Sequence, residues 1–179
     1  MFPLRDDNPD FLTPWVTYGI IGLNILAWVF LQGMGTEPAL SRSVCTLGLM
    51  PGDLLGTLPD GTEFQVGPKT WCVLGDSPAV HTLFTSMFMH GGWMHIIGNM
   101  WFMWVFGNNL DDSMGLVRFA TFYLLCGIAA AAGETLSDPD SGIPMVGASG
   151  AIGGVNRYSP VVPCLIGSPS ARKRVARPS

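Results

Sequence analysis

Three polar residues in apolar surroundings have the types and spacing that nucleophilic catalysis uses. Ser149 lies in the segment Gly147-Ala148-Ser149-Gly150 and opens a predicted apolar helix. At a helix N-terminus, unpaired backbone N–H groups and the positive end of the helix dipole stabilise nearby negative charge. His95 and Asn99 are four residues apart, so on a helix they share one face. Polar residues inside a membrane segment are costly and indicate function by default, so we predict Ser149 as a nucleophile.

Each of these residues also has an interpretation without chemistry. A serine between glycine and alanine is often a small packing residue of a membrane helix. Similarly, His95 and Asn99 can form hydrogen bonds between helices, as asparagine commonly does in membrane bundles. Spacing alone leaves both interpretations of the pair open.

Two soluble interpretations of the glycine-rich segment fail. The nucleophile elbow of α/β-hydrolases needs Gly-x-Ser-x-Gly, but here Ala151 stands where the second glycine is required. The spacing of Gly147, Gly150 and Gly153 is similar to a dinucleotide-binding loop, which needs an acidic residue about 20 positions later. No acidic residue follows Asp140.

Composition indicates one membrane domain. Hydrophobic residues make up 48% of the 179 residues, charged residues 12%, and the mean hydropathy is +0.36. Soluble domains carry about 25% charged residues. Residues 1–155 hold all 13 acidic and four basic residues, whereas residues 156–179 hold five basic residues and no acidic one. We therefore predict a basic tail over 156–179, either disordered or translated out of frame.

Cysteines and histidines give no metal pattern. His90 and His95 lack the spacing and the glutamate of helical metalloproteases, and the four cysteines lack zinc spacing. Cys45 and Cys72 lie in one loop and can pair in an oxidising compartment, while Cys126 is expected in an apolar helix. No cleavable signal peptide is expected at the N-terminus.

Hydropathy predicts an all-α polytopic membrane protein with about three complete spans and the start of a fourth. The complete spans are Trp15–Leu31, Trp93–Leu110 and Leu116–Gly133, near the 17–25 residues that a bilayer requires. Met34 to about Gly92 is predicted as a partly helical loop at the membrane interface. A fourth span begins at Ser149 and is broken from Asn156 onward, by an arginine and a proline.

The few basic residues predict the orientation. Arg5 and Arg118 place the N-terminus in the cytoplasm, because cytoplasmic segments carry the excess of Lys and Arg. Ser149 is then expected at the outer-facing end of its helix, and we expect an integral multi-pass protein of the plasma (inner) membrane.

Together these residues resemble the rhomboid family of intramembrane serine proteases over roughly Trp15 to Val155. The segment Gly147-Ala148-Ser149-Gly150 is similar to the family's Gly-x-Ser-Gly, and His95-x-x-x-Asn99 to its second-helix motif. His90, five residues before His95, and the segment from Gly107 through Gly115 also match. The serine motif alone is a weak signal, but the ordered combination is specific.

The resemblance implies a rhomboid-like bundle of at least six spans that cleaves transmembrane segments of membrane-anchored proteins within the lipid bilayer. Ser149 is implied as the nucleophile, with a histidine of the sixth span as general base. His95, Asn99 and the Ser149 backbone N–H are implied as the oxyanion hole. The chemistry needs no cofactor, metal or nucleic acid.

Two departures from the family pattern shape the expectations. Trp71 is followed by Cys72, where the family's first loop often has Trp-Arg. In addition, no histidine follows Ser149, so the general base and the last spans are expected to be missing from a truncated or frameshifted copy. We therefore expect this chain by itself to be inactive. The alternative is a non-catalytic rhomboid-like protein that binds transmembrane segments.

Overall fold

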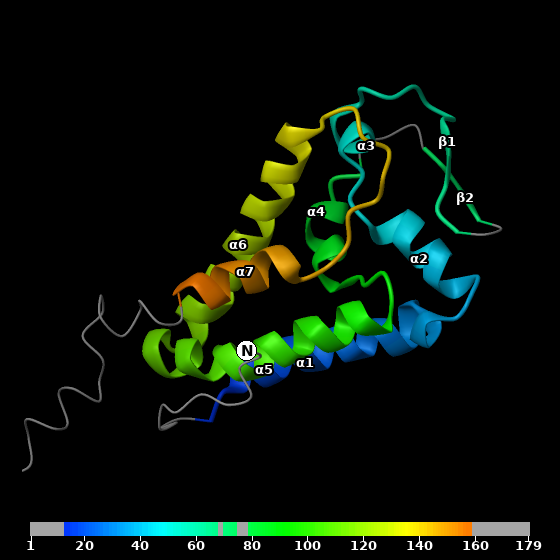
Figure 1. Cartoon of the computed structure of the whole chain (residues 1–179). Coiled ribbons are helices and arrows are strands. Elements are labelled where there is room, and N and C mark those ends of the chain that lie inside the picture. The colour runs from blue at the N-terminus through cyan, green and yellow to red at the C-terminus, as the bar shows by residue number, and fades with distance from the viewer. Residues whose placement is uncertain (1–12, 68–69, 75–78, 159–179) are drawn as a thin grey trace, which may run out of the picture.

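The computed structural model describes residues 13–67, 70–74 and 79–158, and these residues are mostly helical. Helix α1 (Trp15–Leu26) continues into the π-helical turn η1 (Ala27–Leu31). Helix α5 (Trp93–Met114) lies along α1. Helix α6 (Leu116–Ser137) begins just after the C-terminal end of α5 and runs at a steep angle to it (Figure 1). Helix α7 (Ser149–Tyr158) packs against both α6 and α5.

Small residues allow these helices to approach closely. A Cβ on Gly107 of α5 would stand 2.6 Å from Oγ1 of Thr17 in α1. On α7, a Cβ at Gly150 would collide with the Cβ of Ala130 in α6. Glycine at these two positions is therefore required by helix packing, as in many membrane bundles.

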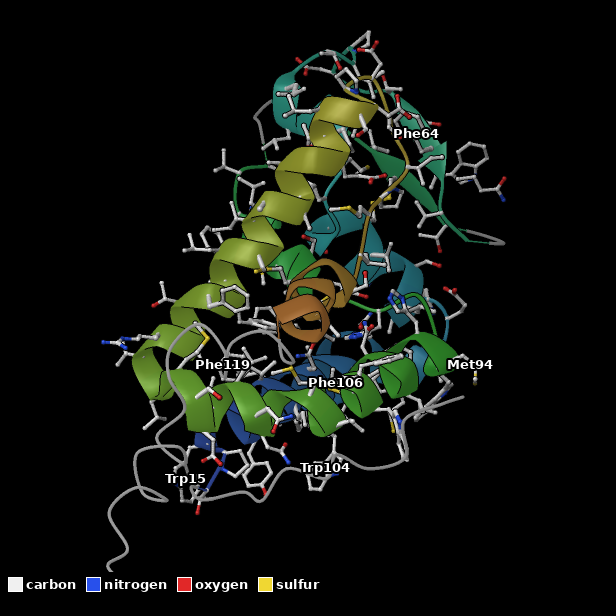
Figure 2. The ribbon with its side chains drawn as sticks, turned by 60° about the vertical axis from the view of Figure 1, so that its left-hand side comes forward. Trp15, Phe64, Met94, Trp104, Phe106 and Phe119 are labelled. Carbon is white, nitrogen blue, oxygen red and sulfur yellow. A yellow bond between two sulfur atoms is a disulfide. The ribbon has the colours of Figure 1, made fainter. Side chains whose placement is uncertain are left out.

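The core lies where α1, α5, α6 and α7 meet. Its buried members are Ile20, Met87, Met103, Leu110, Phe119, Tyr123, Ala148, Ala151 and Ile152. By contrast, Trp104 lies on the side of α5 that faces away from α7, and 55% of it is exposed (Figure 2). Ala148 and Ala151 flank Ser149, so this core fixes the start of α7.

A subdomain of short elements connects α1 to α5. It comprises the 3-10 turn η2 (Gly33–Gly35), α2 (Ala39–Leu47), α3 (Pro51–Leu55), β1 (Glu63–Gln65), β2 (Trp71–Val73), α4 (Thr82–Thr85) and the 3-10 turn η3 (Ser86–Phe88). The strands pair antiparallel with Phe64 opposite Cys72. A disulfide joins Cys45 of α2 to Cys72 of β2, so the two cysteines expected to be able to pair do so.

The helices agree with the predicted spans at their starts more than at their ends. Helix α1 with η1 covers Trp15–Leu31, as predicted. The predicted second span ends at Leu110, whereas α5 continues as a helix to Met114, and α6 likewise passes Gly133. Helix α7 extends to Tyr158, beyond the boundary expected at 155, and residues 159–179 of the predicted tail lie outside the described residues.

Among the described helices, α6 alone is both long enough and apolar enough to cross a membrane. The helix Trp15–Leu31 is apolar but shorter. Helix α5 is as long as α6 but carries His95, Asn99 and Asp111 among its polar residues. The number of spans therefore stays a prediction.

Asp111 is buried, although two consecutive aspartates after an apolar run usually indicate a return to water, and it caps α1. Its Oδ2 accepts hydrogen bonds from the backbone N–H groups of Val16 at 2.9 Å and Thr17 at 3.1 Å. The first N–H groups of a helix have no partner within the helix, and a carboxylate there also meets the positive end of the dipole. This carboxylate therefore fixes the end of α5 to the start of α1.

Replacing Asp111 by asparagine is expected to lower the free energy of unfolding by about 2 kcal/mol, because one oxygen, Oδ2, accepts both bonds and both lose their charged acceptor. Thermal unfolding in detergent measures this. The control is Asp138→Asn, because Asp138 is exposed at the end of α6 and should change stability by less than about 0.5 kcal/mol. Equal melting temperatures for Asp111→Asn and the wild type would contradict the prediction.

Candidate active site

The segment before α7 is held to the subdomain by backbone hydrogen bonds. Leu49 and Met145 exchange two of them, with N–O distances of 3.0 and 2.7 Å. The N–H of Gly147 donates to the carbonyl of Ser86 at 2.8 Å. The Ser149 side chain is exposed at the first residue of α7, next to the buried Ala148. The serine is therefore accessible, while the backbone on its N-terminal side is fixed.

His95 lies in the first turn of α5, with an orientation set by its own loop. The backbone N–H of Gly91 donates to Nδ1 of His95 at 3.3 Å. A ring nitrogen that accepts a hydrogen bond carries no proton, so we assign the proton of the neutral imidazole to Nε2. His95 therefore presents a donor, not an acceptor, at Nε2.

Gly147 is the point at which His95 and Ser149 meet. A Cβ on Gly147 would lie 2.7 Å from both Cε1 and Nε2 of His95, and 3.5 Å from Oγ of Ser149. Gly147 also has a φ of +123°, a region that residues with a side chain rarely adopt. The imidazole and the hydroxyl thus border one small space, which exists because residue 147 has no side chain.

Asn99 follows His95 by one turn and has an unused donor. Its side chain is 8% exposed, and its Nδ2 has no hydrogen-bond partner among the described residues. Leaving a buried polar group without a partner costs about 1–3 kcal/mol. Helix α5 packs against α7, so this donor belongs to the helix that faces the serine's helix. Such a group is available to an incoming acceptor.

His90 is held by its backbone, not by its ring. Both of its ring nitrogens are buried without a hydrogen-bond partner among the described residues. Its ring meets those of His95 and Trp28 edge to face, with centroids 5.3 and 6.4 Å away. The peptide groups of His90 instead bond to the Gln32 side chain.

The stability of the protein is expected to fall in acid because of His90. Burial, and to a lesser degree the neighbouring His95, lower the pKa of His90 from 6.5 to about 4. Between these values the unfolded chain binds more protons than the folded protein, so the stability is complete above about pH 6.5 and is lost as the pH falls toward 4. At about 1.4 kcal/mol per pH unit, the loss reaches about 3 kcal/mol.

Melting temperatures measured from neutral to acidic pH test this expectation. His90→Leu has a similar volume, removes the titrating ring and should flatten the profile. The exposed His81 provides the control, and His81→Gln should leave the profile unchanged. If the melting temperature of His90→Leu falls in acid as steeply as that of the wild type, the loss of stability comes from groups other than His90.

Two functional features were missed from sequence. Gln32 directly follows the apolar run Trp15–Leu31, and a polar residue at that position is the signal that could have drawn attention to it. The positive φ of Gly147 has no sequence signal beyond the glycine itself.

Among the described residues, no group of three or more His, Cys, Asp or Glu side chains could hold a metal ion.

Comparisons with known proteins identify a domain that covers this site. A family profile described as Rhomboid domain matches residues 77–162, which include His95, Asn99 and Ser149. RHOMBOID-like protein 6, mitochondrial, from Arabidopsis thaliana is 34% identical over 124 residues, which are 69% of this chain and 34% of that protein. Rhomboid-like protein 11, chloroplastic, from the same plant is 32% identical over 100 residues, which are 55% of this chain and 35% of that protein.

RHOMBOID-like protein 5 of Arabidopsis thaliana is 30% identical over 73 residues, which are 41% of this chain and 24% of that protein. The chain thus spans about a third or less of the length of the curated relatives it matches. No solved structure matches the chain. Two of the relatives' names place those proteins in organelles, so the comparisons give no support to the expected plasma membrane.

Proposed function

Because the chain belongs to the rhomboid family and is thereby a membrane protein, we propose that it carries the nucleophile and oxyanion site of an intramembrane serine protease. The substrates would be membrane-anchored proteins, cleaved within or beside a transmembrane segment. The observation that supports this most is the space beside Gly147, which the hydroxyl of Ser149 and the imidazole of His95 both border.

In this proposal Oγ of Ser149 attacks the carbonyl carbon of the scissile peptide bond. The C–O bond forms as the carbonyl oxygen takes up the negative charge. Nε2–H of His95, Nδ2–H of Asn99 and the backbone N–H of Ser149 are the donors available to that oxygen. Collapse of the intermediate expels the amine and leaves an acyl-serine, which water hydrolyses.

The proton of Ser149 needs an acceptor, and His95 does not supply it in the form described. Its Nδ1 is occupied by the Gly91 N–H, and its Nε2 already carries a proton. The three histidines of the chain all precede Ser149. In the proposed mechanism a separate imidazole base takes this proton and donates it to the nitrogen of the departing amine, and it then takes a proton from the water that hydrolyses the acyl-serine. His95 acts on the oxyanion only.

The second candidate is a rhomboid-like protein that binds transmembrane segments without cutting them. In the form described, His95 offers Ser149 no proton acceptor, because Nδ1 accepts the Gly91 N–H and Nε2 carries the proton, and this favours the second candidate. The open hydroxyl and the unused donor of Asn99 favour the protease, because a protein that only binds has no need of either.

One experiment separates the two candidates. The full chain, reconstituted in lipid vesicles, is treated with a fluorophosphonate probe with and without added imidazole as an exogenous base. The protease proposal expects a phosphonyl group on Ser149, identified by mass spectrometry, and faster labelling with imidazole. A chain that binds a fluorescent transmembrane peptide but leaves Ser149 unlabelled under both conditions would support the second candidate and contradict the first.

A further inference from the structure

The side chain of Gln32 is buried at the junction between α1 and the subdomain. Gln32 follows η1 directly, and its backbone N–H still donates to the carbonyl of Ala27 at 3.1 Å. The residue is fully buried, although a glutamine side chain carries one acceptor and two donors that burial must satisfy. The hydrogen-bond partners of this amide therefore show which part of the chain Gln32 holds in place.

Both functional atoms of the Gln32 amide bond to the backbone of one residue, 58 positions away. Nε2 donates to the carbonyl of His90 at 2.6 Å, and Oε1 accepts the N–H of His90 at 2.9 Å. This pairing resembles the exchange of bonds between two strands, and it holds the loop just before α5 against the end of α1. Neither His90 ring nitrogen takes part.

The same peptide unit that Gln32 holds also contacts His95. The carbonyl of His90 and the N–H of Gly91 belong to one planar peptide group, in which they point in opposite directions. Gln32 binds the carbonyl side, and the N–H side donates to Nδ1 of His95 at 3.3 Å. Fixing the plane of this peptide therefore fixes the direction of the N–H toward the imidazole.

We propose that Gln32 is a positioning residue, which acts through the His90–Gly91 peptide to hold His95 with its proton on Nε2, toward Gly147 and Ser149. In the other tautomer Nδ1–H would face the Gly91 N–H, donor against donor, and Nε2 would present a lone pair to the oxyanion. The consequence for catalysis rests on the proposed protease function, but the tautomer and the hydrogen bond do not.

The experiment measures the protonation of the His95 ring nitrogens directly and does not require catalytic activity. The full chain is labelled with ¹⁵N in the histidine rings and at glycine, and studied in detergent at about pH 8, well above the usual imidazole pKa of about 6.5. The chain has three histidines, so His95→Gln identifies the His95 signals by their loss. In the wild type we expect an unprotonated Nδ1, a protonated Nε2 and a protected Gly91 amide.

The first variant is Gln32→Met, which keeps a similar volume and removes both bonds to His90. It is expected to move the two His95 ring nitrogens toward a mixture of tautomers and to speed hydrogen exchange at Gly91 about tenfold, which corresponds to about 1.4 kcal/mol. Gln32→Glu is the second variant, used if Gln32→Met does not fold. It keeps an acceptor for the His90 N–H but replaces the donor to the His90 carbonyl by a carboxylate, and should change the same signals.

Two controls distinguish an effect on the position of His95 from a general loss of stability. Gly91→Ala keeps the N–H, and its Cβ would lie at an ordinary 3.8 Å from Nδ1 of His95, so the His95 signals should stay as in the wild type. Asp111→Asn weakens the opposite end of α1 and should lower stability without changing the tautomer.

Unchanged His95 nitrogens in a folded Gln32 variant would overturn the proposal, as would equal changes in Asp111→Asn. If the tautomer shifts as expected while Ser149 remains unlabelled by fluorophosphonate in every form, the positioning stands and the protease function fails.

Discussion

Ser149→Ala is expected to remove all imidazole-dependent phosphonylation of the chain, because the alanine methyl has no nucleophilic oxygen. The fold should be retained, since the Ser149 side chain is exposed and its removal leaves no buried group unpaired. Intact-mass spectrometry after reaction with the probe measures the effect. If the same assay detects cleavage of a membrane-anchored substrate, that cleavage should disappear as well.

Ser137→Ala is the matched control for this experiment. Ser137 is also an exposed serine, at the end of α6, and its hydroxyl donates to the carbonyl of Gly133 at 2.7 Å. Its replacement should leave labelling at the wild-type rate. Undiminished labelling in Ser149→Ala would exclude Ser149 as the nucleophile and require another residue to be found from the labelled peptide.

Gly147→Ala is expected to slow phosphonylation of Ser149 by about 10²–10³-fold, the usual effect of losing one oxyanion donor. The new methyl would stand 2.7 Å from Cε1 and Nε2 of His95, closer than a Cβ can approach a ring. These atoms are the far end of a side chain that can rotate, so we expect the ring to move and the fold to survive. The donor at Nε2 is then lost from the site.

The cost to stability should be smaller than the cost to reactivity. An alanine at a φ of +123° is strained by about 1–3 kcal/mol, which thermal unfolding can measure beside the labelling rate. Gly153→Ala, on α7, is the control, because a Cβ there meets nothing within 4 Å, and it should leave labelling unchanged. A Gly147→Ala variant that labels at the wild-type rate would show that the space beside Gly147 is not the oxyanion site.

Sequence patterns predicted the start of each long helix because composition changes sharply there. The apolar run from Trp15 ends at Leu31, and a helix of the same bounds follows. The pair His95 and Asn99 could be placed on one face because helical periodicity is local. Their approach to Ser149 could be suggested only by resemblance, since it depends on how α5 and α7 pack across the 34 residues, 115–148, that separate them.

The errors came from long-range partners that no local pattern encodes. Two consecutive aspartates after an apolar run indicate a return to water, yet Asp111 is 4% exposed because the start of α1 supplies its hydrogen-bond donors. Similarly, no prediction was made for Gln32, because its partner His90 is 58 positions away. A polar residue beside an apolar run can be solvated or paired, and the sequence alone does not distinguish the two.

The cross-link between Cys45 and Cys72 has a consequence for the topology of the protein. Disulfides persist in oxidising compartments and are rare where glutathione keeps thiols reduced. The cross-link lies in the subdomain that also pairs with Met145, just before Ser149. We therefore expect the hydroxyl of Ser149 to open toward the oxidising side of its membrane, in the compartment where the cross-link forms.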